Sequence, residues 1–415
     1  MNRRIVITGL GTVNPVGNTV EETWGNIRAG RSGVGFISSF DTANYDVKIA
    51  AEVKNFDPSA YIDPKNARKM ARFSQFAVVA AMQAFKDSGL APGDFDPERF
   101  GVSIGNGVGG FEVIDASLRK MVEQGPRRIP PLTVPELIAN EAAANISKEL
   151  GLKGFAHTTM TACTSGTDAI GAALDMLRLN RCDFCIAGGT EACVAELPIA
   201  GFDIIHALSR RSDDPTKASR PFDKDRDGFI LGEGAAMLVL EDYDHARARG
   251  AKIYAELAGY GLSCDAYHLT APDPSGEQGI RAIRLALEDA GLAPDDIDYY
   301  NAHGTSTPIN DPIETKMLKG ALGDRAYKIK VSSTKSMTGH LIAASGAVEA
   351  LICALAIRDG FYPPTINLDN PDIEAGCDLD YVPNKGVEGE INAALSGSLG
   401  FGGHNGVLAF RKVRD

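Results

Sequence analysis

Short apolar segments rich in β-branched residues alternate along this chain with longer segments of helical periodicity. The short segments predict strands at residues 4–8, 101–104, 183–187, 236–240, 253–257, 298–301, 329–332, 393–396 and 407–410. The longer segments repeat their apolar positions at helical spacing and predict helices at residues 71–88, 164–179, 277–290, 313–318 and 343–358. This alternation predicts an α/β protein with parallel or mixed sheets and helices on their faces.

A charged stretch at residues 246–252 follows one predicted strand and marks a boundary between two parts of the chain. We expect an N-terminal unit at residues 1–250 and a C-terminal unit at residues 251–415. Both units show the same alternation of strands and helices, which indicates two related halves, although no clean sequence repeat is detectable. Two polar excursions, at residues 105–135 and 205–234, are rich in Gly, Pro or charge and are expected to be functional loops.

Composition and charge then narrow the class of protein. The chain has 415 residues, with 42 Lys and Arg against 54 Asp and Glu, a formal net charge of −12 that argues against nucleic-acid binding. No apolar segment approaches the ~20 residues that span a membrane, and the N-terminus lacks an export signal. We therefore expect a cytoplasmic protein whose seven cysteines are reduced thiols.

Glycine is in excess, at 45 of 415 residues, or about 11%, against about 7% on average. One glycine-rich segment, Gly-Asn-Gly-Val-Gly-Gly at residues 105–110, matches the G-x-G-x-x-G pattern of dinucleotide-binding loops. No second strand ending in an acidic residue follows at the required distance, so the context of that motif is missing. We interpret the segment as a glycine-lined turn packed against a pocket.

Two further motifs imitate metal sites. Asp-Lys-Asp-Arg-Asp-Gly at residues 223–228 resembles the start of a calcium-binding loop, but its twelfth position is Gly234 instead of a bidentate glutamate. Cys182 and Cys185 form a C-x-x-C pattern within a predicted strand, where residues three apart point to opposite faces. We expect acids that fix a loop and two packed thiols.

Cys163 lies immediately before the predicted helix at residues 164–179. A cysteine at the positive end of a helix dipole is expected to have a lowered thiol pKa, and its small neighbours leave space for a substrate. A lone cysteine is more often a buried structural residue, so the other side chains around it decide between the two readings.

Two histidines, His303 and His340, lie in polar, glycine-rich turns that follow predicted strands, and Lys335 lies in the second of these turns. Strand ends are where parallel sheets place reactive groups. Either histidine alone could be a core residue, but the four groups together predict a convergent active site. A further turn at residues 400–406 can present backbone N–H groups to an oxyanion.

Five segments carry a family resemblance: TACTSGTDAIGAA, NAHGTSTPIND, STKSMTGHLIAASGAVEA, PPTINLDNPD and GFGGHNG. Together they resemble the β-ketoacyl-acyl carrier protein synthases, most closely those of the elongating synthase II type, and the similarity runs along essentially the whole chain. The resemblance implies a thiolase-like fold of five αβαβα layers built from two similar halves. It also implies a homodimer.

The resemblance further implies a role for each residue of the predicted site. Cys163 corresponds to the nucleophile that holds the acyl chain as a thioester. His303 and His340 correspond to the pair that drives decarboxylation of malonyl-acyl carrier protein, either as N–H donors or with one acting as a base towards water; the sequence leaves both open. The backbone N–H groups of Cys163 and Phe401 correspond to the oxyanion hole, and Phe401 to a gating side chain.

Supporting roles follow from the same resemblance. Lys335 corresponds to an electrostatic and hydrogen-bonding support, and Thr305 and Thr307 to contacts for the phosphopantetheine arm. No redox cofactor, pyridoxal phosphate or catalytic metal is required, because decarboxylation supplies the carbanion. A monovalent cation is expected near Asn301, Glu349 and Ser396.

Two softer expectations concern the acyl pocket and the carrier surface. Val108 and Phe202 correspond to residues that line the acyl tunnel, with plain packing variation as the alternative. Lys65, Arg68, Lys69 and Arg72 are spaced to form one basic face if helical, and Arg127 and Arg128 add a second basic spot. An acidic acyl carrier protein fits such patches, with ordinary solvated charge as the alternative.

Two departures from the family pattern and three rival functions complete the expectations. His206 stands where many relatives have an arginine near the entrance, which leaves the carrier contacts there open, and His404 stands where many have threonine and is expected not to be a third catalytic histidine. A polyketide ketosynthase would use the same residues. A thiolase would have a second cysteine in place of His340, and a chain-length-factor-like partner would lack Cys163.

Overall fold

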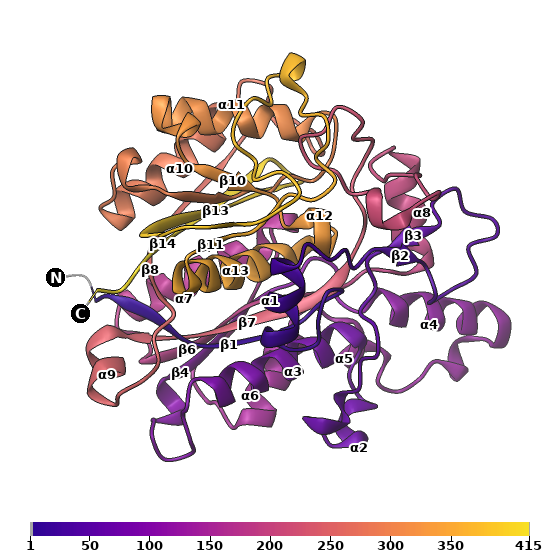
Figure 1. Ribbon diagram of the computed structural model, residues 1–415. Helices are drawn as coiled ribbons and strands as arrows, with labels where there is room; N and C mark the ends of the chain where they lie inside the picture. Colours follow the sequence, from indigo (N-terminus) through magenta and orange to yellow (C-terminus); the bar gives the residue numbers. More distant parts are fainter. Residues whose placement is uncertain (1–2, 415) are drawn as a thin grey trace.

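The computed structural model describes residues 3–414, which fold around one ten-stranded mixed sheet (Figure 1). The first five long strands are β1 (Ile5–Val13), β4 (Phe100–Gly105), β5 (Ala156–Thr159), β6 (Phe184–Ala192) and β7 (Glu233–Asp242). The second five are β8 (Ala255–Cys264), β9 (Tyr299–Asn301), β10 (Lys330–Ser332), β13 (Ala393–Gly400) and β14 (His404–Arg411). Four short strands lie outside the sheet: β2 (Gly35–Phe36), β3 (Ile49–Ala50), β11 (Phe361–Tyr362) and β12 (Val387–Glu388).

The two sets of five strands have the same order. They lie side by side as β5-β4-β6-β7-β1 and β10-β9-β13-β14-β8, which in both sets is third, second, fourth, fifth and first along the chain. In each set the second strand runs parallel to the third and fourth, and the fifth runs antiparallel to its neighbours. The sets join where residues 5–7 of β1 pair with residues 255–257 of β8. The repeat that is undetectable in the sequence is therefore present in the topology.

Helices complete five layers, as expected for a thiolase-like fold (Figure 1). In the first half they are α1 (Val20–Arg28), α2 (Pro64–Ala67), α3 (Arg72–Asp87), α4 (Phe111–Gln124), α5 (Thr133–Leu137), α6 (Glu141–Leu150), α7 (Ser165–Arg178), α8 (Glu196–Ile204) and α9 (Tyr243–Ala248). In the second half they are α10 (Glu277–Ala290), α11 (Asn310–Leu322), α12 (Lys335–Thr338) and α13 (Ser345–Asp359). Helices α3 and α6 cover the first five strands, α10 and α11 cover the second five, and α7 and α13 pack between the two.

The central layer explains the most apolar stretch of the sequence. Every residue of α13 from Ser345 to Ile357 is buried, because the helix contacts strands of both sets. A helix surrounded in this way is apolar on all sides and shows no amphipathic stripe. The N-terminal ends of α7 and α13 also touch: a Cβ at Gly166 would lie 2.5 Å from the Ala343 carbonyl oxygen, and a Cβ at Gly346 would lie 2.1 Å from Thr167 Oγ1.

All nine predicted strands and all five predicted helices are present, with their ends moved by a few residues. The expectation of a loop throughout residues 105–135 is wrong, because this segment contains α4 and α5. Strand β5 was not predicted. Its sequence, Ala-His-Thr-Thr, lacks an apolar alternation because the strand lies at the edge of the sheet, partly exposed. The excursion at residues 205–234 is mostly irregular, as expected.

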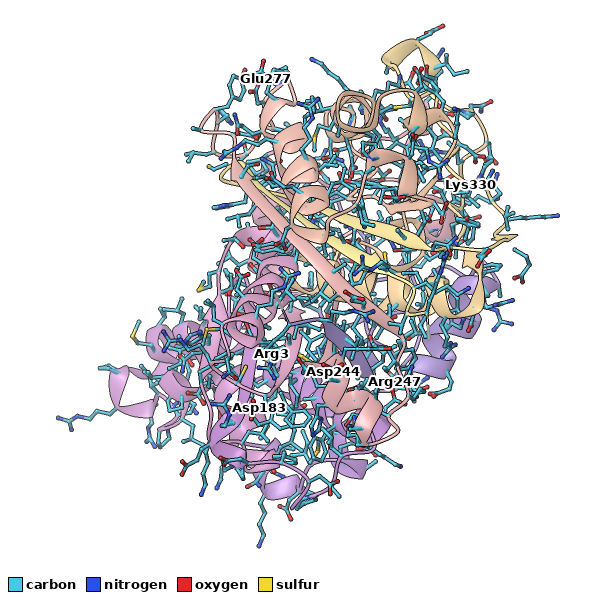
Figure 2. The ribbon with its side chains drawn as sticks, turned by 90° about the vertical axis from the view of Figure 1, so that its left-hand side faces the viewer. Arg3, Asp183, Asp244, Arg247, Glu277 and Lys330 are labelled. Atoms are coloured by element: carbon cyan, nitrogen blue, oxygen red, sulfur yellow. The ribbon has the colours of Figure 1, made fainter. Side chains whose placement is uncertain are left out.

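Ion pairs fix the beginning of the described chain to the first half. Arg3 pairs with Asp242 at 3.0 Å and approaches Asp183 at 3.9 Å, so it ties the end of β7 to the start of β6. Figure 2 shows Arg3 and Asp183 beside Asp244 and Arg247 of α9, far from Glu277 and Lys330 of the second half. Within residues 3–414, we find no helix that is both long and apolar enough to cross a membrane.

Candidate active site

A cavity of about 600 Å³ brings together the side chains that the sequence predicts to be reactive. Its wall includes Gly107 of the glycine-rich segment at residues 105–110, Phe229 of the excursion at residues 205–234, and His340 and Phe401 of two of the predicted turns. Every predicted catalytic or substrate-binding residue except Lys335 lines this cavity: Cys163, His303, His340, Phe401, Val108, Phe202, Thr305 and Thr307. His206 and His404, the two departures from the family pattern, line it as well.

Cys163 lies in a 3₁₀ turn, Ala162–Thr164, that leads directly into α7. Ala162 has a left-handed backbone, with φ at +53°, which turns the chain sharply between β5 and the helix. Ser165 closes the turn, because its Oγ accepts a hydrogen bond from Thr161 N at 2.9 Å and donates one to the Ala162 carbonyl at 2.6 Å. The result is a sulfur held at the helix N-terminus and facing the cavity.

The pKa of Cys163 differs from the expectation of a lowered value. Burial raises it to about 11, although the Lys335 ammonium and the backbone N–H groups of Phe401 and Cys163 itself act in the opposite direction. The sequence places the thiol at a helix N-terminus but does not show how completely it is enclosed. The group is therefore a neutral thiol near pH 7.

His340 contacts the sulfur directly. Its Nε2 lies 3.1 Å from Cys163 Sγ, and its Nδ1 lies 2.9 Å from the hydroxyl of Ser345. Ser345 Oγ also accepts a hydrogen bond from Leu341 N at 2.8 Å, so the position of this hydroxyl is fixed by the backbone. Ser345 thereby holds the imidazole with Nε2 towards the sulfur.

His303 stands beside His340, with ring centroids 5.2 Å apart and ring planes at 89°. Glu314 of α11 fixes the turn that carries it: its carboxylate accepts hydrogen bonds from His303 N and Gly304 N, both at 2.7 Å. The Nδ1 atom of His303 is buried and has no hydrogen-bond partner among the described residues. A free polar atom at this position can bind a substrate oxygen or a water molecule.

Both imidazoles are neutral near pH 7. Burial lowers the pKa of each well below its usual value of 6.5, and the positive charge of Lys335 lowers both further. A neutral imidazole keeps one N–H donor and one free nitrogen, so each ring can donate to an oxyanion or accept a proton.

Lys335 lies behind the cavity wall, 1% exposed, in a buried ion pair with Glu349 of α13. Burial raises the pKa of Glu349 to about 7. Among the described residues, four polar atoms of Glu349, Ser396 and Asn301 are buried without a hydrogen-bond partner: Glu349 Oε2, Ser396 Oγ, and both the oxygen and the nitrogen of the Asn301 amide. Asn301 and Ser396 are directly paired across β9 and β13, so they lie next to each other.

Sequence reasoning did not identify Glu314 or Ser345 as part of the site. Glu314 had a detectable signal, because it occupies a buried position on the same helical face as Leu318, where a carboxylate is rare unless it is bonded. Ser345 had a weaker signal, its position five residues after His340 at the start of a helix. Both act on the backbone around a histidine, which only the folded structure shows.

The two motifs that resemble metal sites, at residues 223–228 and at Cys182 and Cys185, have other roles in the structure. Asp223 accepts hydrogen bonds from the backbone of Asn370 at 2.8 Å and of Asp225 at 2.9 Å, and it pairs with Arg220. Cys182 and Cys185 are free, buried thiols. In the described part of the chain no group of three His, Cys, Asp or Glu residues is arranged to hold a metal ion.

The basic residues do not form the single helical face that their spacing suggested. Helix α2 ends at Ala67, and Arg72 begins α3 with its guanidinium turned towards Glu233, 2.6 Å away. The expectation is wrong for Arg72, because the chain bends between the two helices. The remaining residues are exposed at the surface: Lys65, Arg68, Lys69, Arg127 and Arg128.

Comparison with known families gives two matches that together cover most of the chain. Residues 2–246 match the family described as Beta-ketoacyl synthase, N-terminal domain. Residues 254–369 match the family described as Beta-ketoacyl synthase, C-terminal domain. The gap between the matches lies between β7 and β8, where the first set of five strands gives way to the second.

Individual relatives match over the full length. The chain is 50% identical over 413 residues to a 3-oxoacyl-[acyl-carrier-protein] synthase 2 of Coxiella burnetii, covering 100% of this chain and 99% of the relative. It is 49% identical to the synthase of the same name from Synechocystis sp., with 99% of each chain covered. Among solved structures, a type II polyketide ketosynthase in complex with its acyl-carrier protein matches with a TM-score of 0.93 and 36% identity, covering 100% of both chains.

Proposed function

This chain belongs to the β-ketoacyl synthase family, and from that premise we propose that Cys163, His303 and His340 carry out its reaction. The reaction is that of the second type of 3-oxoacyl-[acyl-carrier-protein] synthase: an acyl chain is condensed with a malonyl unit, with loss of carbon dioxide, and grows by two carbons. The observation that supports the residue roles is the contact of 3.1 Å between His340 Nε2 and Cys163 Sγ in a cavity that also holds His303.

In the first step the Cys163 sulfur attacks the acyl thioester on the carrier. The new C–S bond replaces the bond to the carrier sulfur, and the thiol proton ends on the departing carrier thiol. His340 Nε2 relays this proton, because its depressed pKa leaves it neutral and it lies within hydrogen-bond distance of the sulfur. The backbone N–H groups of Cys163 and Phe401 stabilise the oxyanion that forms on the acyl carbonyl.

In the second step the malonyl thioester loses carbon dioxide, and the electron pair of the broken C–C bond moves into an enolate. His303 and His340 each donate an N–H hydrogen bond to the enolate oxygen. The carbanion then attacks the acyl carbonyl on Cys163, and the sulfur leaves as a thiolate that takes a proton from solvent, which replaces the one given to the carrier thiol in the first step. Thr305 and Thr307 lie in the same cavity, with hydroxyls 3.0 Å apart, and are placed to contact the phosphopantetheine arm.

Ser345 allows His340 to serve in both steps. A serine hydroxyl can donate to Nδ1 or accept from it. When Ser345 accepts, Nε2 is free to take the thiol proton, and when Ser345 donates, Nε2 carries the hydrogen that holds the enolate oxygen.

The orphaned polar atoms behind the cavity fit a small monovalent cation. Asn301, Ser396 and Glu349 offer neutral and charged oxygens, which such ions prefer. A cation held there would neutralise the part of the Glu349 carboxylate that Lys335 does not reach. It would stabilise the residues behind the two histidines and take no part in bond making, and the chemistry needs no organic cofactor.

Acyl carrier protein is the proposed partner, and Lys65, Arg68 and Lys69 are its proposed docking residues, with Arg127 and Arg128 as a second basic contact. These side chains are exposed on a chain whose net charge is −12, so they offer the local positive charge that an acidic carrier requires. A solved relative binds its own acyl-carrier protein, which supports the proposal.

Reversing the charge of Lys65 and Lys69 together, as Lys65→Glu/Lys69→Glu, is expected to raise KM for the acyl carrier protein about tenfold or more. The kcat value should change little, because neither residue touches the reacting atoms. Steady-state rates at low and high salt measure the effect. Lys328→Glu/Lys385→Glu changes the same net charge at two other exposed lysines and should leave KM unchanged. An equal rise in KM for both variants would contradict docking at this patch.

A homodimer is supported by an open sheet edge and apolar side chains near it. Strand β5 is the last strand of the sheet, and its outer edge is free to pair with β5 of a second copy. Exposed apolar residues from α4, α5 and the segment after β5 are of the kind that dimer interfaces bury: Val122 is 82% exposed, Val134 62% and Met160 58%. Sedimentation equilibrium would measure a monomer mass if this proposal were wrong.

Three remaining proposals concern location, domain division and pathway. We place the protein in the cytoplasm, since all seven of its cysteines are free thiols. We divide the chain into residues 1–250 and 251–415, in the linker between β7 and β8. We favour fatty-acid elongation over polyketide synthesis, because the identity to the 3-oxoacyl-[acyl-carrier-protein] synthases is 50% against 36% to the polyketide enzyme.

The experiment that tests the residue roles combines purified protein with an acyl carrier protein charged with an acyl group and then with malonyl carrier. Peptide mass spectrometry should find the acyl group on Cys163, and product analysis should find the 3-oxoacyl thioester. An unmodified Cys163 together with ongoing product formation would overturn the assignment of the nucleophile.

A further inference from the structure

Glu191 is a fully buried carboxylate that the reaction does not use. It lies near the end of β6 with 0% exposure, and the partners that hold it are backbone and uncharged side-chain groups. Its Oε2 accepts a hydrogen bond from Gly107 N at 2.9 Å, and its Oε1 accepts one from Asn106 Nδ2 at 3.2 Å. Burying a carboxylate without a positive partner costs free energy, and these hydrogen-bond donors compensate for part of the hydration that it loses.

The donors come from the glycine-rich segment at residues 105–110. Glycine-rich turns bind anions because successive backbone N–H groups point to one place. Burial raises the pKa of Glu191 to about 7, and the N–H groups of Gly107 and Val108 act in the opposite direction by stabilising its charged form. A Cβ at Gly107 would lie 2.5 Å from Glu191 Oε2, so only glycine lets the carboxylate approach. The turn that resembles a phosphate-binding loop is thus already filled by an anion of the protein itself.

The same carboxylate reaches the histidine side of the cavity. The backbone N–H of Ala343 also stabilises its charge, and Ala343 lies between His340 and the start of α13. The Cys193 thiol is a further hydrogen-bond partner. Gly107 and Val108 line the cavity, and a Cβ at Gly107 would lie 3.5 Å from Ile342 Cγ2, in the segment that follows His340. Glu191 therefore joins the wall of the acyl pocket to the segment that follows His340.

We propose that Glu191 is a positioning residue that holds Val108 and the 105–110 turn in place, and so controls how fast long acyl chains are transferred to Cys163. This inference rests on the proposed role of Cys163 as the acylated residue. Val108 packs in the same apolar cluster as Cys163, Cys193 and Ile342, so a shift of the turn changes the space beside the sulfur. Long chains should be more sensitive than short ones, because they need more of that space.

The charge of Glu191 also affects the Cys163 thiol. The negative charge of Glu191 raises the pKa of Cys163, in addition to the larger effect of burial. Removing the charge should therefore shift the pH profile of Cys163 alkylation by iodoacetamide towards lower pH. A general loosening of the fold would also lower the midpoint by hydrating the thiolate, so Glu191→Asp, which keeps the charge, is the control and should leave the midpoint unchanged.

Glu191→Gln tests the proposal, because the amide puts an N–H₂ group among backbone donors and leaves at least one of them unpaired. Acylation of Cys163 by palmitoyl carrier is expected to slow about tenfold to a hundredfold, with a smaller effect on butyryl carrier. Decarboxylation of malonyl carrier should be nearly unchanged. Glu241→Gln is the matched control, because Glu241 is a buried carboxylate on the neighbouring strand β7, held by Arg249, and outside the cavity.

The outcomes separate this proposal from the assignment of the nucleophile. If wild-type Cys163 is not acylated, the assigned role of Cys163 fails. If wild-type Cys163 is acylated and Glu191→Gln shows the same rates for both chain lengths, the role of Glu191 alone is refuted. Equal slowing in Glu191→Gln and Glu241→Gln also contradicts it, because that result indicates general destabilisation.

Two milder variants keep the test valid if Glu191→Gln does not fold. Glu191→Asp keeps the charge and should restore much of the long-chain rate and the wild-type alkylation profile. Cys193→Ala removes one hydrogen-bond partner of the carboxylate and should slow palmitoyl transfer slightly, with butyryl transfer less affected. The proposal would be overturned if Cys193→Ala transferred palmitoyl and butyryl groups at the wild-type ratio of rates and Glu191→Asp lost acylation completely.

Discussion

Condensation is expected to fall by at least ~10⁴-fold when Cys163 is replaced by glutamine, as for the loss of other catalytic nucleophiles, whereas malonyl decarboxylation continues. Glutamine cannot form the acyl thioester, so the carbanion has no acyl carbonyl to attack. Its side-chain carbonyl can occupy the proposed oxyanion hole at the N–H groups of residues 163 and 401, as an acylated cysteine would. His303 and His340 then meet a malonyl thioester in a site that resembles the acyl-enzyme.

Two measurements on Cys163→Gln check this expectation. Mass spectrometry should show no acyl adduct after incubation with acyl carrier, and release of carbon dioxide from malonyl carrier should continue. Cys377→Ala, which changes another buried cysteine that does not line the cavity, should keep condensation. Loss of decarboxylation along with condensation in Cys163→Gln would contradict the separation of roles between the sulfur and the histidines.

The second large effect is expected for His303→Ala, which should lower decarboxylation about 10²- to 10³-fold, the usual cost of removing one donor to an oxyanion. Acylation of Cys163 should persist in this variant, because the imidazole in contact with the sulfur is that of His340. His340→Ala should slow both steps. A mass shift on Cys163 and the rate of carbon dioxide release, measured on the same samples, distinguish the two histidines. Failure of His303→Ala to become acylated would refute the assignment.

The pH dependence gives an additional check on the two histidines. Their pKa values lie well below 6.5 because of burial and the charge of Lys335. A lowered histidine pKa means that the neutral form persists as the pH falls through 6.5, and protonation begins only at lower pH. Decarboxylation by Cys163→Gln should therefore show no histidine titration near 6.5. A rate that halves at that pH would show that the imidazoles are not held neutral.

Much of the architecture could be predicted from local patterns, and the parts that could not have physical reasons. Strands such as β6 and β7 are buried on both faces and give continuous apolar runs. Strand β5 has no such run because it lies at an exposed edge. Helix α4 does carry apolar residues at helical spacing, but only Ser117 of this helix is buried and Val122 is 82% exposed, and glycine- and proline-rich segments flank it.

The site was predictable as a set of residues but not in its electrostatics. Cys163 and His340 could be identified from turns and motifs, yet the direction of the thiol pKa shift depends on enclosure by segments far away in the sequence. Glu314 and Glu191 act through backbone groups of other segments, and Glu191 lies within an apolar strand segment where a single acid attracts no notice. Contacts of this kind depend on the tertiary structure and have no local signature.

The close contact between the N-terminal ends of α7 and α13 has a mechanical consequence. Cys163 precedes the first of these helices and His340 precedes the second, and Gly166 and Gly346 let the two ends meet without intervening side chains. The proposed reacting pair is therefore carried by two helix ends in direct contact. By contrast, His206 and Thr270, which also line the cavity, are exposed. We therefore expect a side chain larger than glycine at position 166 or 346 to push the two helix ends apart, and with them the sulfur and the imidazole, without touching either.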